Sequence, residues 1–198
     1  MARVRSRRSG SAATVMAIVA LAGVGSACVG ATPREEFVEE IRSRGGGLTA
    51  ALALDAVAAV EEALGTTGLR VRVVSIDPAG ALVTMEVRDP ARLGNLDLWA
   101  VSGGDVRGPQ AVRLSAQDDL DRDTYAIALV ALDRLEAMAD AALAAFDSDG
   151  AWVERVTIIP GDAGQGQPPA LTMSLASPRA RATAMFSADA ELVEVVRQ

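Results

Sequence analysis

Carboxylate side chains are the main candidates for chemistry in this chain of 198 residues, because the sequence contains no histidine and no lysine. Without histidine it cannot build a Ser-His-Asp triad, a Cys-His pair or a histidine metal ligand. Without lysine it lacks the residue for a Schiff base or for a Walker phosphate-binding loop. The sequence therefore excludes these mechanisms, and we predict a protein with no catalytic residue and no cofactor.

The densest group of carboxylates is Asp119, Asp121 and Asp123, which have the D-x-D-x-D spacing of a calcium-binding loop. An EF-hand loop also needs glycine at its sixth position and glutamate at its twelfth. Those positions hold Thr124 and Val130. We therefore interpret the aspartates as the acidic start of a helix, where the helix dipole favours negative charge, and we predict no metal site.

Paired glutamates could serve a glycoside hydrolase, which places two carboxyl groups across the scissile bond. Glu61 and Glu62, like Glu35 and Glu36, are adjacent on expected helices and point to different sides. Aromatic residues make up only 3% of the chain, so few side chains could stack on a sugar. A carboxylate-dependent hydrolase is therefore the least favoured function.

Cys28 is the only cysteine, and it follows a pattern typical of an export signal. The basic stretch MARVRSRR precedes an apolar run of 14 residues, 12–25, and small residues follow. That order is typical of a secretory signal peptide. The apolar run is shorter than the roughly 20 residues that span a membrane. We predict a signal peptide over residues 1–27.

The residues around the cleavage point, Gly25-Ser26-Ala27-Cys28, resemble the lipobox of bacterial lipoproteins, although Gly25 stands where a branched apolar residue is usual. This resemblance implies cleavage after Ala27 and a diacylglycerol on Cys28, which would tether the chain to the outer face of the cytoplasmic membrane. Two acyl chains give stable anchoring. Two alternatives remain: ordinary cleavage giving a soluble secreted protein, and an uncleaved membrane anchor.

The region after Cys28 is expected to be a short tether. Thr32, Pro33 and Glu35 form a helix start, with a capping threonine and a proline at the first helical position. Three glycines, residues 45–47, then end the helix. We assign residues 28–47 to a lipidated N-terminus with a short helix and a glycine-rich linker.

The rest of the chain contains an internal repeat. RVRVVSIDP, residues 70–78, matches WVERVTIIP, residues 152–160, at an offset of 82. LVTMEVRDP, residues 82–90, matches ALTMSLASP, residues 170–178, at an offset of 88. Two collinear matches indicate a duplication. We predict one unit over residues 48–114 and a second over 115–198.

Each unit begins with a helical pattern and continues with strands. Apolar residues at helical spacing predict helices over 49–64 and 124–146. Alternating apolar and polar residues predict strands, including third strands near 95–101 and 183–187 and a last one near 192–196. The expected fold class is α+β: two tandem α-β-β-β repeats forming antiparallel sheets with helices on one face.

This arrangement resembles two families of small α+β units. FSADAELVEV, residues 186–195, resembles the last strands of the PepSY module of secreted bacterial proteins. The tandem plan resembles the β-lactamase inhibitor protein, whose two units share one sheet. Both resemblances imply binding or inhibition and carry no catalytic motif. As a whole, the arginine-rich, lysine-free chain resembles lipoproteins of the actinobacterial type.

The expected function is therefore a non-catalytic binding or structural module, anchored through Cys28, with a protein or peptide partner. Trp99 with Arg88 and Glu86 is the candidate binding surface if Trp99 lies on the open sheet face, but core packing of Trp99 at a sheet edge is the favoured interpretation. Beyond residue 8, 15 arginines face 26 acidic residues, a net charge of −11, which argues against nucleic acid as a partner. A carrier of a small apolar ligand or lipid, with a cavity between helices and sheet, is the second hypothesis.

Overall fold

A computed structural model of the chain describes residues 47–161, 167–187 and 189–198. The predicted signal peptide, the cleavage point at Ala27, the lipidation site at Cys28 and the helix after Thr32 lie outside the described residues. These expectations therefore stay predictions.

The first helix, α2, spans Ala50–Leu64 and confirms the helix predicted over 49–64. The side chain of Thr49 caps its N-terminus by accepting a hydrogen bond from the backbone N–H of Leu52. At the other end Gly65 has a left-handed backbone with φ of 63°, which glycine adopts without strain. Local signals therefore fix both ends of this helix.

The strands form one nine-stranded sheet in which every pairing is antiparallel. Eight strands follow the order β4-β3-β2-β1-β6-β7-β8-β9, and the short strand β5 pairs with β1. The chain therefore has the predicted α+β fold with an antiparallel sheet. The strands are β1 Arg70–Asp77, β2 Leu82–Arg88, β3 Leu96–Ser102, β4 Asp105–Ala111, β5 Tyr125–Ala126, β6 Trp152–Ile159, β7 Ala170–Ala176, β8 Arg181–Phe186 and β9 Leu192–Arg197.

Strand β4 was not predicted, because its sequence DVRGPQA has no apolar alternation and contains proline. It lies at the end of the sheet and pairs only with β3 among the described strands. Proline and charged residues are tolerated at such an edge, where one side of the backbone faces solvent. A strand of this kind leaves a weak signal in the sequence.

The helix predicted over 124–146 is wrong in its first half. The region 120–134 instead holds a four-residue helix α3, Leu120–Asp123, then β5 and two 3₁₀ turns, η2 Ile127–Leu129 and η3 Leu132–Arg134. Only α4, Leu135–Phe146, is a regular helix. Tyr125 explains the difference, because it pairs with Val71 of β1 and its buried hydroxyl donates to the carbonyl of Ile158, 3.3 Å away. Tertiary pairing overrides helical periodicity here.

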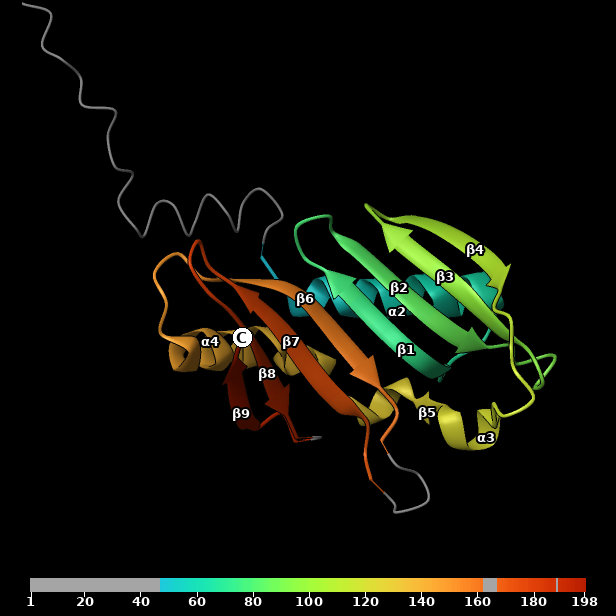
Figure 1. Ribbon diagram of the computed structural model, residues 1–198. Coiled ribbons are helices and arrows are strands. Elements are labelled where there is room, and N and C mark those ends of the chain that lie inside the picture. Colours follow the sequence, from blue (N-terminus) through green and yellow to red (C-terminus); the bar gives the residue numbers. More distant parts are fainter. Residues whose placement is uncertain (1–46, 162–166, 188) are drawn as a thin grey trace, which may run out of the picture. The chain divides into compact units, whose positions relative to one another are not determined.

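The helices α2 and α4 both pass behind the strands in Figure 1, so they cover one face of the sheet. Apolar residues at alternate strand positions meet the buried side of each helix in a single core. Helix α4 contributes Leu135, Met138, Ala142 and the fully buried Phe146. The opposite face of the sheet is left to the intervening, mostly polar side chains.

Candidate functional site

The helix-free face of the sheet, called here the open face, carries a line of hydroxyl groups across its middle. Register pairs Ser75 of β1 with Thr84 of β2 on one side and with Thr157 of β6 on the other, and Thr157 with Thr172 of β7. Directly opposed residues point to the same side of a sheet. These four residues, the hydroxyl row, therefore span four adjacent strands, about 14 Å at the usual strand spacing.

The hydroxyl row is half-buried and only partly engaged in hydrogen bonds. The hydroxyl of Thr172 donates to the backbone carbonyl of Thr157 at 3.3 Å. The hydroxyls of Ser75, Thr84 and Thr157 make no hydrogen bond to another residue in the part of the chain that the structure describes. Each can both donate and accept, so the row can bind amide or hydroxyl groups of a ligand laid across the strands.

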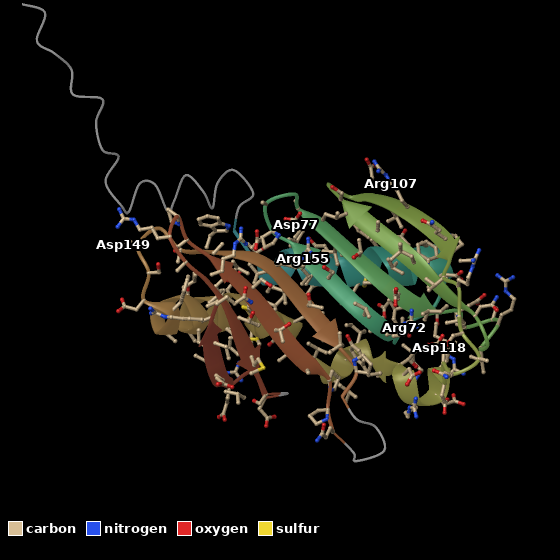
Figure 2. The ribbon with its side chains drawn as sticks, viewed as in Figure 1. Arg72, Asp77, Arg107, Asp118, Asp149 and Arg155 are labelled. Carbon is tan, nitrogen blue, oxygen red and sulfur yellow. The ribbon has the colours of Figure 1, made fainter. Side chains whose placement is uncertain are left out.

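An ion-pair network lies beside the row, at one end of β1 and β2. Arg72 Nε is 2.7 Å from Glu86 Oε2, and Arg72 Nη1 is 3.5 Å from Asp118 Oδ1. Figure 2 shows Arg72 and Asp118 close together at this end of the sheet. Arg88 Nη1 is 2.7 Å from Asp121 Oδ1. The network ties the segment after β4 to the open face.

Hydrogen bonds and charges in this network shift the pKa values of Arg72 and Asp118. The hydrogen bond to Glu86 raises the pKa of Arg72, so this side chain stays protonated and positively charged. The backbone N–H of Ser115 donates to Asp118 and, with the nearby charge of Arg72, lowers the pKa of that carboxyl below its ordinary value. The network thus places oppositely charged side chains within ion-pair distance of one another.

The structure separates the three residues predicted as a binding surface. Arg88 and Glu86 do lie on the open face, but both are ion-paired, and Arg88, whose side chain is 11% exposed, also donates to the carbonyl of Leu93 at 2.7 Å. Trp99 pairs with Met85 and points to the helix side, where it is 5% exposed. The open-face position considered for Trp99 is therefore wrong, and its core packing, the favoured interpretation, is confirmed.

Gly108 of β4 explains how Trp99 fits at the sheet edge. A Cβ at Gly108 would lie 2.9 Å from the Trp99 ring, and its φ is 137°. Only glycine meets both demands, because any side chain would strain the backbone and collide with the indole. Trp99 is thus packed against bare backbone.

Trp152 is the tryptophan that the open face carries. It pairs with Ala176 on that face and is 36% exposed. Its position next to Val153, a core residue, could have predicted this placement. Neighbouring side chains of a strand point to opposite faces of the sheet. Large aromatic side chains exposed on a sheet are frequent anchors for a partner.

The aspartates with calcium-like spacing have structural partners. Asp119 caps helix α3 by accepting hydrogen bonds from the N–H groups of Asp121 and Arg122. Asp123 accepts from the N–H of Asp119 at 2.8 Å, and this bond lowers the pKa of its carboxyl. They start the short α3 rather than the predicted long helix. Within residues 47–161, 167–187 and 189–198, no three Asp, Glu, Cys or His side chains are placed to hold a metal ion.

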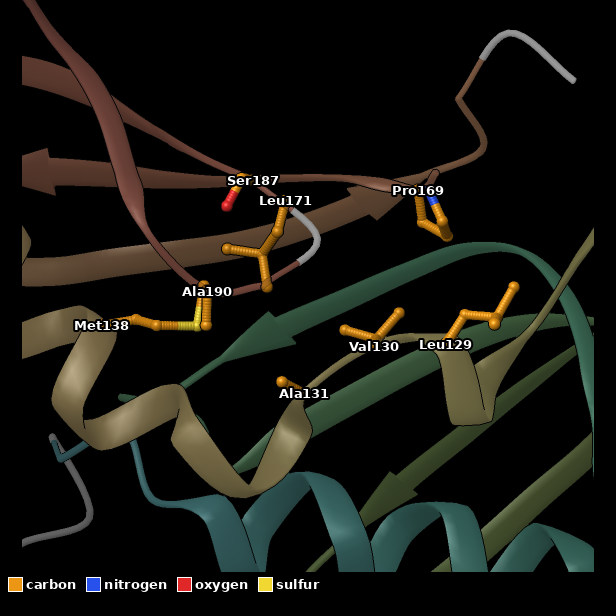
Figure 3. A pocket seen from close by; sticks show the side chains of 8 residues that line it. All are labelled: Leu129, Val130, Ala131, Met138, Pro169, Leu171, Ser187 and Ala190. Carbon is orange, nitrogen blue, oxygen red and sulfur yellow. The ribbon is translucent and has the colours of Figure 1, made fainter. Parts of the chain in front are cut away.

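A small apolar crevice lies between the segment 129–138 and the start of β7. Figure 3 shows its lining, which includes Leu129, Val130, Met138 and Leu171. Its volume is about 10 Å³, enough for roughly one water molecule.

Comparison with known proteins gives this chain no relative: no family model, no curated protein and no solved structure matches it. Among the described helices, none has the length and apolar character needed to cross a membrane.

Proposed function

We propose that this chain is a lipid-anchored extracytoplasmic protein whose body is a non-catalytic binding module, with the open face as its binding surface for a protein or peptide partner. The observation that carries the proposal is the hydroxyl row, three of whose hydroxyls lack a hydrogen-bond partner among the described residues. Trp152 adds an exposed aromatic side chain on the same face. An extended peptide or a loop offers the amide groups that such a row binds.

Export and anchoring rest on the sequence before residue 29. The basic stretch, the apolar run and Gly25-Ser26-Ala27-Cys28 occur in the order that a lipoprotein signal requires. A lipid on Cys28 would hold the body at the membrane surface, where its partner would also lie.

We further propose that the body is a tandem duplication of two α+β units. Ser75 and Thr157, which match at the sequence offset of 82, are register partners at the junction of β1 and β6. Around them Val74 pairs with Ile158 and Ile76 with Val156, as a local twofold axis relating the units requires. The strand order is also symmetric about this junction, and both β1–β2 and β6–β7 contain a register shift near their start. The hydroxyl row then lies where the two units meet.

The carrier hypothesis ranks second. Pockets for small ligands usually have about 300–1,000 Å³. The crevice between helices and sheet has about 10 Å³, so an apolar ligand would have to part α4 from β7. The open face needs no such rearrangement, and for this reason we favour it as the binding surface.

Site-specific photo-cross-linking tests the binding surface. A photoreactive amino acid replaces Thr157 in the hydroxyl row or, as the matched control, the exposed Ala58 on the outer side of α2. In intact cells we expect a discrete covalent adduct from position 157 and none from position 58. The absence of an adduct at 157, or the same adduct at both positions, would contradict the proposal.

Fractionation of cells that produce the Cys28→Ser variant tests the anchor. We expect the wild-type chain in the membrane fraction, labelled by an alkyne-tagged fatty acid, and the variant unlabelled and released. A variant that stays in the membrane with an unchanged mass would show that Cys28 is not the anchor.

A further inference from the structure

Arg155 of β6 is an exposed cation on the open face without a counter-ion among the described residues. It precedes the buried Val156, so alternation along the strand directs it away from the helices, and Figure 2 shows it beside Asp77 on this face. Its guanidinium makes no ion pair and no hydrogen bond to any other residue that the structure describes. A guanidinium carries five N–H donors in a planar fork, whose shape matches a carboxylate.

The strand pair β1–β2 shows how an arginine at the corresponding place in the sheet is neutralised. The register shift of this pair contains Arg72, which is ion-paired with Glu86 on the neighbouring strand. The register shift of β6–β7 reaches Arg155, which pairs with Ser174. Ser174 matches Glu86 at the sequence offset of 88, so a neutral hydroxyl stands where the first strand pair has its counter-ion. The sheet therefore neutralises one arginine internally and leaves the other available to a ligand.

Two carboxylates lie near Arg155, and neither is its counter-ion. Glu154, the preceding residue, is ion-paired with Arg181 of β8. Asp77 lies across the junction of β1 and β6, where it accepts a hydrogen bond from the N–H of Gly80 at 3.1 Å. Its carboxylate forms no ion pair with Arg155. An anion that binds Arg155 therefore has to come from outside the described part of the chain.

Hydroxyl groups complete the surroundings of Arg155. Ser174 faces it from β7, and Thr157 lies two residues along β6 on the same face. Neither hydroxyl makes a hydrogen bond to another described residue, so both can donate to an anion. We propose that Arg155, with these two hydroxyls, binds a carboxylate of the protein or peptide partner, so that the segment bound on the open face carries Asp or Glu.

The charge of the body favours a carboxylate over a surface rich in phosphate. One guanidinium neutralises one carboxylate and can bind both of its oxygens. A membrane surface rich in phosphate would bring many negative charges towards a body in which acidic residues outnumber arginines, and their repulsion opposes binding. This inference rests on the proposed use of the open face as a binding surface, and it specifies the chemistry of the segment bound there.

Selection from a phage-displayed library of random peptides, each about eight residues long and so able to span the hydroxyl row when extended, tests the proposal on the purified protein. We expect the selected peptides to contain Asp or Glu. Replacing that residue by Asn or Gln should weaken binding to the wild type by about tenfold or more and leave binding to Arg155→Gln nearly unchanged, because the charge-assisted bond exists only with the guanidinium. The matched control is Arg179→Gln, which removes the same charge from the exposed turn after β7 and should bind like the wild type.

Ser174→Glu tests the same site with Arg155 in place. The new carboxylate should pair with Arg155, as Glu86 pairs with Arg72, and should weaken binding of the acidic peptides by about tenfold or more. The midpoint of thermal unfolding should not fall, which would separate a blocked site from a damaged fold. Ser174→Gln is the control of similar length without a charge, and it should bind the peptides more tightly than Ser174→Glu.

The possible results separate this inference from the proposed function on which it rests. Peptides that cross-link to position 157 and not to position 58, but lack carboxylates or keep their preference for them in Arg155→Gln, would overturn the inference and leave the open face as a binding surface. Sedimentation with phosphatidylglycerol vesicles that depends on Arg155, without binding of acidic peptides, would assign Arg155 to lipid headgroups and also overturn it. The absence of any peptide bound to the open face would contradict the proposed function itself, and the inference with it.

Discussion

Ser75 lies between Val74 and Ile76 on β1, and these neighbours show how differently the two faces of the sheet are used. Val74 and Ile76 are fully buried against the helices, whereas Ser75 lies half-buried on the open face with its hydroxyl unpaired among the described residues. Packing of apolar side chains stabilises the helix side, whereas strand pairing and ion pairs keep the residues of the open side in place. Substitutions on the helix side should therefore cost far more stability than substitutions of similar size on the open side.

Phe146→Ala should produce the largest loss of stability. Its ring is fully buried at the end of α4, and the Arg197 guanidinium lies 5.6 Å from the ring centre. Removing a buried phenylalanine usually costs about 3–5 kcal/mol. Urea unfolding measures the change. The matched control is Met185→Ala on the open face, which we expect to cost under about 1 kcal/mol. Equal losses of stability in the two variants would contradict the proposed difference between the two faces of the sheet.

Gly108→Ala should follow in size. The added methyl would meet the Trp99 ring at 2.9 Å and occupy a backbone with φ of 137°. Strain and overpacking of this kind cost on the order of 1–3 kcal/mol. Gly94→Ala serves as the control, because a Cβ there meets nothing within 4 Å. Thermal unfolding followed by tryptophan fluorescence would report both changes, and an unaltered Gly108→Ala variant would argue against the packing of Trp99 on β4.

Arg72→Met should cost less, about 0.5–1 kcal/mol, because it removes partly exposed ion pairs to Glu86 and Asp118. A double-mutant cycle with Glu86→Gln isolates the pair energy in chemical unfolding. Thr157→Val, the control, also alters the open face but removes no charge. It should change the free energy of unfolding by no more than about 0.5 kcal/mol. A coupling energy of zero would show that the network does not stabilise the open face.

Asp118 should give the smallest effect on stability, and that effect should depend on pH in the acid range. Its folded pKa lies below the ordinary 3.8, so its contribution to stability is fully present above pH 3.8 and is lost as the pH falls below it through the folded pKa. Unfolding measured as a function of pH should show this decline in the wild type. Asp118→Asn should be less stable near neutral pH and should decline less in acid. An identical acid profile in both proteins would exclude this carboxyl as a contributor.

Local signals made part of the fold predictable. Thr49 and Gly65 mark the ends of α2. The alternation of apolar and polar residues identifies the strands β1 and β2 and separates their two faces. These features depend on residues a few positions apart, so one sequence suffices to find them. The duplication of the two units remains a proposal, as do the anchor at Cys28 and the binding partner.

The features that failed depend on contacts between distant residues. Apolar spacing over 124–134 is compatible with a helix, and only the pairing of Tyr125 with Val71 makes it a strand followed by turns. Alternation in β3 divides Leu98 from Trp99 but does not say which of them faces the helices. The register with Met85 decides that question.

The sequence by itself determined the excluded chemistries, the export pattern, the first helix and the strands other than β4 and β5, because each of these depends on residue type or on short-range spacing. The tertiary structure alone decided which face each strand presents, which strands form the two edges of the sheet and that Ser75, Thr84, Thr157 and Thr172 lie in one line. The physical reason is that strand register is set by hydrogen bonds between segments up to about 80 residues apart, and shifting it by one residue would reverse every face.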